Sequence, residues 1–388
     1  MSLADKINNN VKKMKSNEIV EFNLKIADIP GLISLTYGEP DFATPRHIKD
    51  AAIKAIEDDE SHYTDPRGIK PLRVNAVKFL KDKYGLDYDP DTQITTTVGL
   101  AEGIHDVFTT ILNPGDEVII PTPTYPLYAA NVKFNQATPV FIDTSDNNFI
   151  LTPERLEQAF KEHPNAKAII INYPNNPVGN TYTKKELVAL ANVIRQHEIF
   201  LISDEIYSEL TYDEPHTSFG KLLPDQTIVM NGASKTFAMT GWRIGIVCGP
   251  ADIISKINAV HTLINTNATD NAQFAASEAF KNGENDGLEM KKTYVKRRKL
   301  LRDGLDKAGF TSPEPSGGFY IFAKIPAQFE QDSYKFGYQL AKEALVGIMP
   351  GAIFGPGGDG YVRFSYAAST EDLTEVVNRI QKFVDEHK

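Results

Sequence analysis

Cysteine is almost absent from this sequence: its 388 residues include only Cys248, which lies in the apolar run IGIVCG. A single cysteine can form neither an internal disulfide framework nor a cysteine-based zinc site. Its apolar neighbours favour a small buried side chain over a reactive thiol. The sequence has no H-E-x-x-H motif and no dense run of histidines with acidic residues, so we expect no catalytic metal.

Long hydrophobic runs are absent as well. The sequence contains no stretch of about 18 apolar residues that could span a membrane. The N-terminus, MSLADKINNNVKKMK, lacks the apolar region that a secretory signal requires. We therefore expect a cytoplasmic protein without a membrane partner.

Basic charge is in deficit, because 41 Lys and Arg residues face 51 Asp and Glu residues, for a net charge of −10. Nucleic-acid binding needs a clustered basic face, so we expect no nucleic-acid partner. The basic run KRRKL (296–300) lies in a predicted helix and fits a solvated face. The glycine-rich stretch GPGGDG (355–360) precedes a predicted strand instead of a helix, which favours a loop over a nucleotide site.

The middle of the sequence contains six short apolar runs that are rich in Ile and Val. They do not alternate polar with apolar residues, which is typical of strands buried on both faces of a mostly parallel sheet. Amphipathic segments with helix-capping signals separate them, such as Thr183 with Glu186, and Thr152 with Pro153. This alternation predicts an α/β fold. The runs are 117–121, 137–143, 166–172, 199–204, 227–231 and 243–249.

The pattern changes after about residue 285, where long helices surround the runs GGFYIFAKI and GYVRFSYAAS. This shift predicts a smaller C-terminal α+β domain, and a chain of this length favours more than one domain. We therefore predict an N-terminal arm with part of the small domain over 1–45, a large domain over 46–285 and the small domain over 286–388.

Three of the apolar runs end in polar residues that could form one site. They lead into YPNNPVG, DEIYSEL and GASK, which contain Asn176, Asp204 and Lys235. Taken singly, these residues could be an ordinary turn, a helix cap and a surface lysine. Ligands of open parallel sheets bind beyond the carboxyl ends of the strands, so their shared position indicates a functional site.

The residue types at this edge indicate a particular chemistry. A lysine amine such as that of Lys235 can condense with a carbonyl group to form a Schiff base. A carboxylate such as that of Asp204 can keep a pyridine nitrogen protonated, and Arg243 offers a fixed cation for a phosphate. This combination is what a protein supplies in catalysis by pyridoxal 5′-phosphate (PLP).

With these residues in place, the chain resembles the class I aminotransferase family of fold-type I PLP enzymes, nearly from end to end. The resemblance implies a large domain with a mostly parallel sheet that binds PLP, and a smaller α+β domain. The motifs that carry it are YGEPDFATP (37–45), SHYTDPRGIKPLR (61–73), TTTVGLAEG (95–103), NYPNNPVG (172–179), SDEIYSEL (203–210), GASKTFAMTGWRIG (232–245) and YVRFSYAAS (361–369).

The resemblance implies roles for the residues that contact the cofactor ring. Lys235 resembles the lysine that is bonded covalently to PLP, and Asp204 the partner of the pyridine nitrogen. Tyr207 resembles the donor to the 3′-oxygen, which Asn176 also contacts. Tyr125 lies where the family stacks an aromatic ring on the cofactor.

The resemblance also implies a phosphate site at the start of a predicted helix. The backbone N–H groups of Gly99, Leu100 and Ala101 are expected to hold the phosphate at the positive end of that helix. Arg243 and Ser234 complete this site. Many relatives have Gly, Ser or Lys in place of Leu100 and Ala101, so the backbone has to suffice here.

Three further residues complete the expected site. Tyr63 resembles the tyrosine that reaches the phosphate of the neighbouring subunit, which implies a homodimer. Gly38 lies where the N-terminal segment approaches the substrate. Arg363 resembles the arginine that clamps the substrate α-carboxylate, a task that suits the bidentate guanidinium fork. Position 232 has Gly, whereas some branches of the family have serine there.

The expected activity is transfer of an amino group from an amino acid to a 2-oxo acid through PLP. The pattern is similar to aromatic and to N-acetyl-diaminopimelate aminotransferases. No second arginine has the context of a side-chain carboxylate clamp, so we favour an aromatic or broad-specificity enzyme that uses 2-oxoglutarate. Aspartate and N-acetyl-diaminopimelate aminotransferases remain alternatives, as does a PLP-dependent carbon–sulfur lyase. A non-catalytic PLP-sensing regulator is disfavoured, because too few residues precede Tyr37 for a DNA-reading domain.

Overall fold

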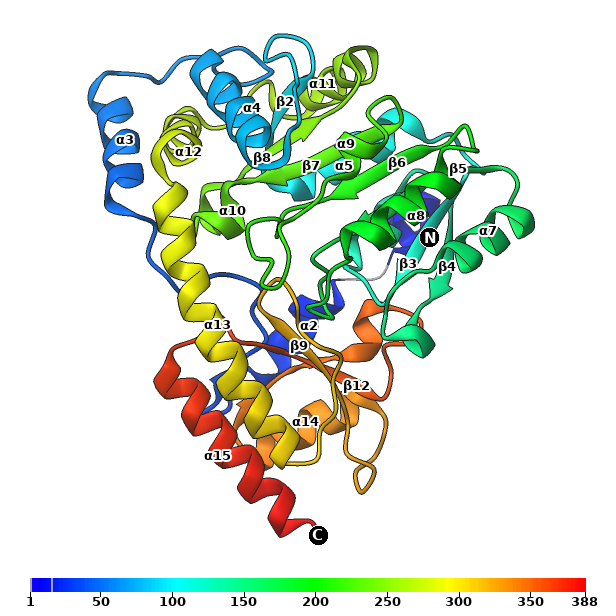
Figure 1. The fold of residues 1–388 in the computed structure, drawn as a ribbon, viewed down its shortest axis with the longest axis vertical. Helices are drawn as coiled ribbons and strands as arrows, with labels where there is room; N and C mark the ends of the chain where they lie inside the picture. The colour runs from blue at the N-terminus through cyan, green and yellow to red at the C-terminus, as the bar shows by residue number, and fades with distance from the viewer. Residues whose placement is uncertain (1, 15–16) are drawn as a thin grey trace.

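The computed structural model describes residues 2–14 and 17–388. Helices enclose a large central sheet, and a smaller group of strands and helices lies beside one end of it (Figure 1). Among the described residues, no helix combines the length and the apolar character needed to cross a membrane.

The large sheet has seven strands in the order β2-β8-β7-β6-β5-β3-β4. Only β8 runs antiparallel to its neighbours, so the sheet is mostly parallel, as the sequence predicts. The strands are β2 (Ile94–Val98), β3 (Glu117–Thr122), β4 (Thr138–Asp143), β5 (Ala166–Asn172), β6 (Phe200–Asp204), β7 (Thr227–Gly232) and β8 (Ile244–Cys248).

All six apolar runs form strands of this sheet, and the predicted fold class is confirmed. The strand β2 escaped prediction because its sequence, ITTTV, is rich in threonine and lacks a continuous apolar character. Its threonines are nevertheless buried, and they pair along β8 at the edge of the sheet. The thiol of Cys248 is buried in β8, as expected.

Helices cover both faces of the large sheet. One face packs against α5, α6 and α11, and the other against α7 and α8 at one end and α3, α4 and α12 at the other. The helices are α3 (Arg46–Glu57), α4 (Lys70–Tyr84), α5 (Gly99–Ile111), α6 (Leu127–Phe134), α7 (Pro153–Glu162), α8 (Lys184–Ile194), α9 (Phe219–Leu222), α10 (Ala233–Thr236), α11 (Ala251–Asn265) and α12 (Asp270–Asn282).

The predicted capping signals begin their helices as expected. The Thr183 side chain accepts from the N–H of Glu186, whose carboxylate accepts in return from the N–H of Thr183, so the capping box of α8 is confirmed. Thr152 accepts from the N–H of Arg155 and caps α7, with Pro153 as the first helical residue.

The C-terminal part of the chain forms a second core with the N-terminal segment. Its strands make an antiparallel sheet, β11-β12-β9, and β10 pairs in parallel with β1 from the N-terminal segment. The strands are β1 (Ile33–Ser34), β9 (Tyr320–Lys324), β10 (Val346–Gly347), β11 (Met349–Pro350) and β12 (Tyr361–Ser365). The helices of this core are α2 (Glu18–Ile26), α13 (Glu284–Lys307), α14 (Ser333–Glu343) and α15 (Thr370–Glu386), and the short helix α1 (Asn9–Lys13), which has no buried residue, precedes α2.

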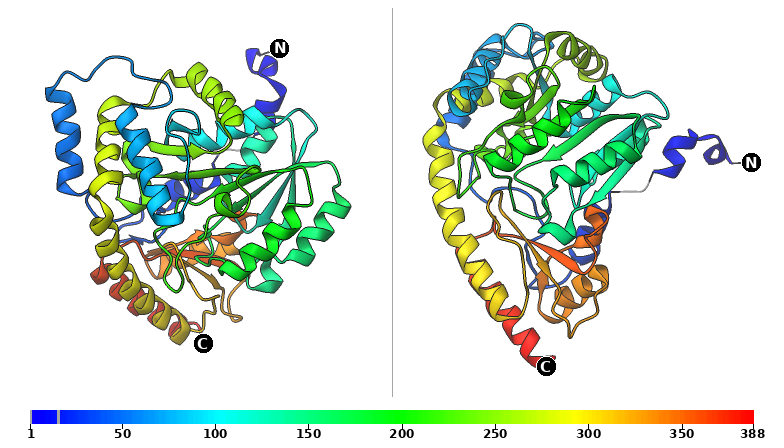
Figure 2. Two further views of the ribbon diagram at one scale, coloured as in Figure 1. Left: turned by 45° about the horizontal axis from the view of Figure 1, so that its top comes forward. Right: turned by 45° about the vertical axis from the view of Figure 1, so that its right-hand side comes forward.

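The long helix α13 runs from the large sheet region down to this second core, where it lies along α15 (Figures 1 and 2). Residues 2–14, which include α1, project from the body of the molecule, as the right-hand view of Figure 2 shows. The pairing of β1 with β10 joins the N-terminal segment to the C-terminal part. The domain boundaries at residues 45 and 285 stay a prediction.

Candidate active site

A cavity of about 280 Å³ opens at the carboxyl edge of the large sheet, where it faces the N-terminal segment and the C-terminal core. Eleven of the thirteen residues that the sequence singles out line it. They are Gly38, Leu100, Ala101, Tyr125, Asn176, Asp204, Tyr207, Ser234, Lys235, Arg243 and Arg363. The sequence reasoning therefore converges on one place in the fold.

Asp204 is the last residue of β6, and its side chain is 4% exposed. Its carboxylate accepts a hydrogen bond of 2.6 Å from the hydroxyl of Tyr128 and one of 3.2 Å from the N–H of Ile206. Burial raises the pKa of Asp204 to about 6 against the effect of these two bonds. The residues after Asp204 form a turn and no helix, so it does not act as a helix cap.

Lys235 lies in the short helix α10, directly after β7. Its Nζ donates a hydrogen bond of 2.6 Å to the carbonyl oxygen of Gly38. Burial lowers the pKa of Lys235 to about 8, and the cations Arg243 and Arg363 act in the same direction. A lysine of this kind is far more often neutral near pH 7 than an exposed one, which suits a group that exchanges protons.

Arg363 comes from β12 in the C-terminal sheet and is 2% exposed. Its guanidinium donates to the side-chain oxygen of Asn176 at 2.7 Å and to the carbonyl oxygen of Thr36 at 2.5 Å, both neutral acceptors. It lies over the rings of Tyr320 and Phe354, 4.5 and 5.0 Å from their centres. Its Nε has no hydrogen-bond partner within the described chain. A buried cation without an anionic partner favours binding of an anion.

The opposite end of the cavity is formed by the turn from β2 into α5. Gly99 has φ +69°, which strains any other residue, and a Cβ atom there would lie 2.2 Å from Nη2 of Arg243 and would displace that side chain. A Cβ on Gly245 would lie 2.8 Å from the backbone nitrogen of Leu100. The glycines thus let Arg243 and β8 approach the first N–H groups of a 13-residue helix, an arrangement that suits a phosphate.

Two hydrogen-bonded tyrosines lie on the wall of the cavity between these ends. The hydroxyl groups of Tyr207 and Tyr320 lie 2.9 Å apart, and both side chains are buried. A Cβ on Gly38 would lie 2.4 Å from the hydroxyl of Tyr320, so a glycine is required where the N-terminal segment passes. Tyr125 is partly buried and meets the ring of Tyr128 edge-on, with ring centres 5.7 Å apart.

Sequence reasoning missed several residues of this cavity. Tyr128 was not predicted; it lies in the first turn of α6, three positions after Tyr125, which precedes the helix. Tyr320 stands in the apolar run GGFYIF, which carries no signal of a site residue. Asn172 accepts from the N–H of Asn176 at 2.9 Å, a contact that only the folded turn reveals.

Two of the predicted residues do not line the cavity. Gly99 lies just behind it, next to Arg243. Tyr63 is 87% exposed and belongs to the segment between α3 and α4. Within one copy of the chain, Tyr63 is therefore a surface residue.

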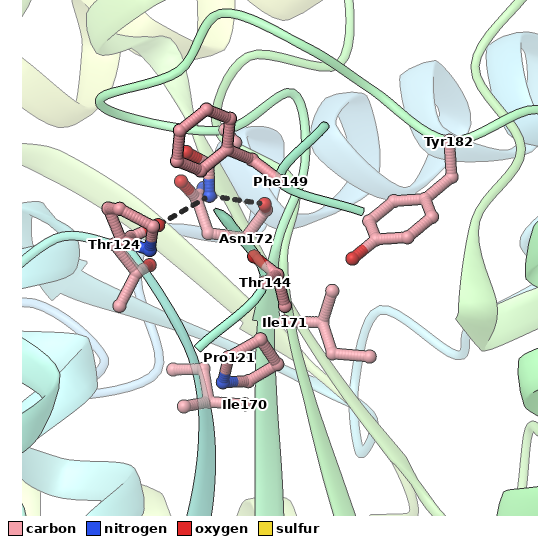
Figure 3. Close-up of a pocket in the computed structure, with 10 residues that line it drawn as sticks. Pro121, Thr124, Thr144, Phe149, Ile170, Ile171, Asn172 and Tyr182 are labelled. Atoms are coloured by element: carbon pink, nitrogen blue, oxygen red, sulfur yellow. Dashed lines mark hydrogen bonds between the residues drawn. The ribbon is translucent and has the colours of Figure 1, made fainter. Parts of the chain in front are cut away.

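A second, much smaller hollow lies behind Asn172 (Figure 3). It measures about 10 Å³, which is room for about one water molecule. The amide of Asn175 spans it with hydrogen bonds of 3.5 Å to the carbonyl oxygens of Pro123 and Asn172. Its size excludes a substrate.

The comparisons with known proteins agree with this geometry. The family described as "Aminotransferase class I and II" matches residues 30–380. A relative from Bacillus subtilis, named as a probable N-acetyl-LL-diaminopimelate aminotransferase, is 41% identical over 97% of this chain and 95% of its own length. An aspartate aminotransferase from Pyrococcus horikoshii is 39% identical over 97% of this chain and 96% of its own.

Among solved structures, an aromatic aminotransferase from Pyrococcus horikoshii superimposes with a TM-score of 0.88. It is 36% identical, and the match covers 94% of this chain and 99% of the other. The similarity therefore extends over the whole fold and is not confined to the site.

Proposed function

The chain belongs to the aminotransferase class I and II family, whose members use PLP, and on that premise we propose the substrate and the roles of the site residues. The enzyme is an aminotransferase. We propose that it takes the amino group from an aromatic amino acid, or from a broad range of amino acids. The acceptor is a 2-oxo acid such as 2-oxoglutarate.

The residues of the cavity fit PLP. One end offers a glycine turn, a helix N-terminus and Arg243 for a phosphate dianion. The middle offers a carboxylate, Asp204, whose charge matches a protonated ring nitrogen, and Lys235 supplies the amine that attaches the aldehyde. When bound, PLP supplies an electron sink that stabilises negative charge on the α-carbon of the substrate.

In this proposal, Lys235 moves a proton. Its Nζ, once neutral, would accept the proton from the substrate α-carbon and, once protonated, would be the acid that returns it when the cofactor is bound. The lowered pKa of Lys235, near 8, supports this role, because a base must be largely unprotonated to act. Asp204 would keep the ring nitrogen of the cofactor protonated, and Tyr128 orients the carboxylate of Asp204.

Other side chains position the reacting groups. Tyr207 and Asn176 would bind the 3′-oxygen of the cofactor, and Tyr125 would pack on its ring. Ser234 supports the phosphate next to the N–H groups of Leu100 and Ala101. The placement of these residues around one cavity supports the assignments.

Arg363 binds the α-carboxylate of the substrate in this proposal. The single observation that carries the proposal is the lack of an anionic partner: among the described residues, this 2% exposed guanidinium donates only to neutral oxygens, and its Nε has no acceptor. A substrate carboxylate would supply the missing anion and displace weaker partners. Gly38 leaves room for the substrate beside it.

The remaining wall of the cavity favours a neutral substrate side chain. Among the described residues that line the cavity, the cations are Lys235, Arg243 and Arg363, and each has a role already. The wall near α2 and the following segment instead contributes Ile19, Tyr37 and two asparagines. These groups suit an aromatic ring or another uncharged side chain better than a carboxylate.

A panel of amino donors with 2-oxoglutarate tests this choice. We expect phenylalanine and tyrosine to give kcat/KM values about tenfold above that of aspartate. The reverse order would replace the aromatic assignment by aspartate specificity. Pyruvate and ammonia released without an added 2-oxo acid would instead identify a lyase.

N-acetyl-LL-diaminopimelate is the second candidate substrate. The 41% identity to the Bacillus subtilis relative named for it favours this alternative. The amide groups of Asn17 and Asn23 in the cavity wall are also suited to a polar, uncharged acyl group. The donor panel therefore includes it, and a kcat/KM above that of phenylalanine would make it the preferred substrate.

We propose further that the active enzyme is a homodimer in which Tyr63 reaches the phosphate end of the partner's cavity. The 87% exposure of Tyr63 in a single chain supports this, because a large aromatic side chain is rarely left so open.

Mixing two inactive variants tests the shared site. Lys235→Ala removes the base from its own cavity, and Tyr63→Ala impairs the cavity of the partner. A mixed dimer holds one intact site. Unfolding the two variants together and refolding the mixture should therefore give more activity than the sum of the two variants alone. Absence of any restoration, with dimers present by sedimentation, would refute the role of Tyr63.

A further inference from the structure

Behind the phosphate turn, three ionisable side chains lie together in the interior. Glu102 and Asp106 come from α5, and His261 comes from α11, which packs against it. One atom from each of the three groups lies within 4.8 Å of the others. Asp106 and His261 are fully buried, and the sequence separates His261 from Glu102 by 159 positions.

Glu102 connects this cluster to the turn. Its Oε2 accepts a short hydrogen bond from the backbone N–H of Val98, the residue directly before Gly99. Its Oε1 accepts from Nδ1 of His261 at 2.8 Å and from the side-chain amide of Asn265 at 2.6 Å. Both oxygens are therefore committed to N–H donors, two of which come from α11.

These hydrogen bonds indicate that Glu102 is ionised and that Nδ1 of His261 carries a proton. Burial opposes the charge of Glu102, but the bonds from His261, Val98 and Asn265 outweigh it and lower the pKa of Glu102, so its carboxylate is ionised. An ionised carboxylate next to Nδ1 requires a proton on that nitrogen. The contact is a charge-assisted hydrogen bond, the stronger kind.

We propose that Glu102 and His261 form a positioning pair that holds the β2–α5 turn in the shape that binds the phosphate of the cofactor. Neither residue lines the cavity, so they act through Val98 and Gly99. This inference rests on the proposed placement of the phosphate at the start of α5. The pair ties the turn to α11, which keeps the first N–H groups of α5 aimed at one point.

A metal ion is the alternative occupant of such a cluster. The observations favour the hydrogen bonds, because a cation at Glu102 would have to displace donors that already satisfy both oxygens. The 2.8 Å between Nδ1 of His261 and Oε1 of Glu102 is a hydrogen-bond distance, shorter than the roughly 3.3 Å between two ligand atoms of a tetrahedral zinc ion. Asp106 takes no part in these hydrogen bonds, because neither of its carboxyl oxygens has a partner in the described chain. Burial raises the pKa of Asp106 to about 7.

The test compares two ligands that differ only in the phosphate. The full chain is stripped of cofactor, and its affinities for PLP and for pyridoxal are measured by absorbance titration. Glu102→Leu removes all three bonds and should weaken PLP binding about 10- to 100-fold, as expected for lost hydrogen bonds to a charged group. Pyridoxal binding should change less than threefold, roughly the scatter of such contributions.

Three further variants show how much each group of the cluster contributes to PLP affinity. Glu102→Gln keeps an acceptor for the N–H of Val98 and should recover part of the loss, while His261→Leu should cost about three- to tenfold in PLP affinity. Asp106→Asn makes no bond to the turn and serves as the matched control with unchanged affinity. The ³¹P chemical shift of bound PLP should move in Glu102→Leu and in His261→Leu but not in Asp106→Asn.

Several results would refute the proposed role of Glu102 and His261. These are unchanged PLP affinity in Glu102→Leu, equal losses for PLP and pyridoxal, or a loss in Asp106→Asn as large as in Glu102→Leu. One equivalent of metal in the wild type that both leucine variants lose would assign the cluster to a cation. Failure of the wild type itself to bind PLP would refute the proposed function instead, so the two failures are distinct.

Discussion

At the end of the cavity formed by β6 and β7, buried ionisable side chains carry the proposed chemistry, whereas at the end formed by α5 the backbone carries it. Burial shifts the pKa of Asp204 and of Lys235 in opposite directions, to about 6 and about 8. At the α5 end, Arg243 is exposed, and Gly99 allows it to approach the helix N-terminus.

The difference reflects what each end has to do. Proton transfer needs groups whose charge can change near neutral pH, and desolvation is the means of achieving that. Binding a permanent anion needs fixed donors and little else. Variants at the end formed by β6 and β7 should therefore alter catalysis, whereas variants at the end formed by α5 should alter the affinity for the cofactor.

Replacing Lys235 by Ala should have the largest effect. Loss of the base and of the covalent attachment should lower kcat by about 10⁴-fold or more, since proton transfer alone contributes up to about that factor. PLP should remain bound but become removable by gel filtration. Lys292→Ala, which changes an exposed lysine, is the control, and retained full activity in Lys235→Ala would refute the assignment.

Replacing Arg363 by Lys should reduce kcat/KM about 100-fold. The ammonium keeps the charge but loses the planar fork that binds a carboxylate through two bonds, and it also loses the stacking on Tyr320. PLP affinity should stay within about threefold. The same change at the exposed Arg46 is the control, and a loss confined to PLP affinity would contradict the carboxylate role.

Replacing Gly99 by Ala should weaken PLP binding about 10- to 100-fold, since the new Cβ would displace Arg243. Gly115→Ala is a matched control, because Gly115 also has a positive φ of +91° but has no atom within 4 Å of a new Cβ. It shares the backbone strain and lacks the clash. Equal effects of the two changes on PLP affinity would show that only strain matters.

The rate at which the cofactor-free chain takes up PLP should rise about tenfold between pH 7 and pH 9. The attacking group is the neutral amine of Lys235, and its lowered pKa of about 8 leaves about a tenth of it neutral at pH 7. Asp204, with a pKa of about 6, is ionised throughout this range. The rate should level off above the pKa of Lys235; a continued rise to pH 10.5 would mean that burial does not lower it.

Replacing Tyr128 by Phe should have the smallest effect, a three- to fivefold loss in kcat/KM. The hydroxyl stabilises the ionised form of Asp204 through a 2.6 Å bond, so its removal should raise the pKa of Asp204 further. The acid limb of the pH–rate profile should therefore move to higher pH. Tyr182→Phe, which removes a hydroxyl outside the main cavity, should leave the profile unchanged.

Much of the fold could be predicted because apolar runs buried on both faces leave a continuous signal. The runs at 166–172 and 227–231 form strands with nearly those bounds. The edge strand β2 could not be predicted in this way, because its threonines are buried by packing that the local sequence does not reveal. Local capping signals were reliable, since they depend on residues only three positions apart.

The site was predictable where a motif carried it and hidden where distant segments meet. Lys235 and Asp204 follow strands with a clear pattern, so their convergence could be expected. The bond from Tyr128 to Asp204 spans 76 positions, and that from His261 to Glu102 spans 159. No short pattern marks such pairs, because each partner is an ordinary residue in its own segment.

The order of residues alone determined six of the seven strands of the large sheet, the ends of several helices and the residue types of the proposed cofactor site. These features depend on neighbours within one element, where spacing and polarity suffice. Only the tertiary structure decided which side chains lose their water, and therefore which pKa values shift and which cation stays without an anion. Desolvation is a property of everything that surrounds a group, and most of those surroundings come from remote parts of the chain.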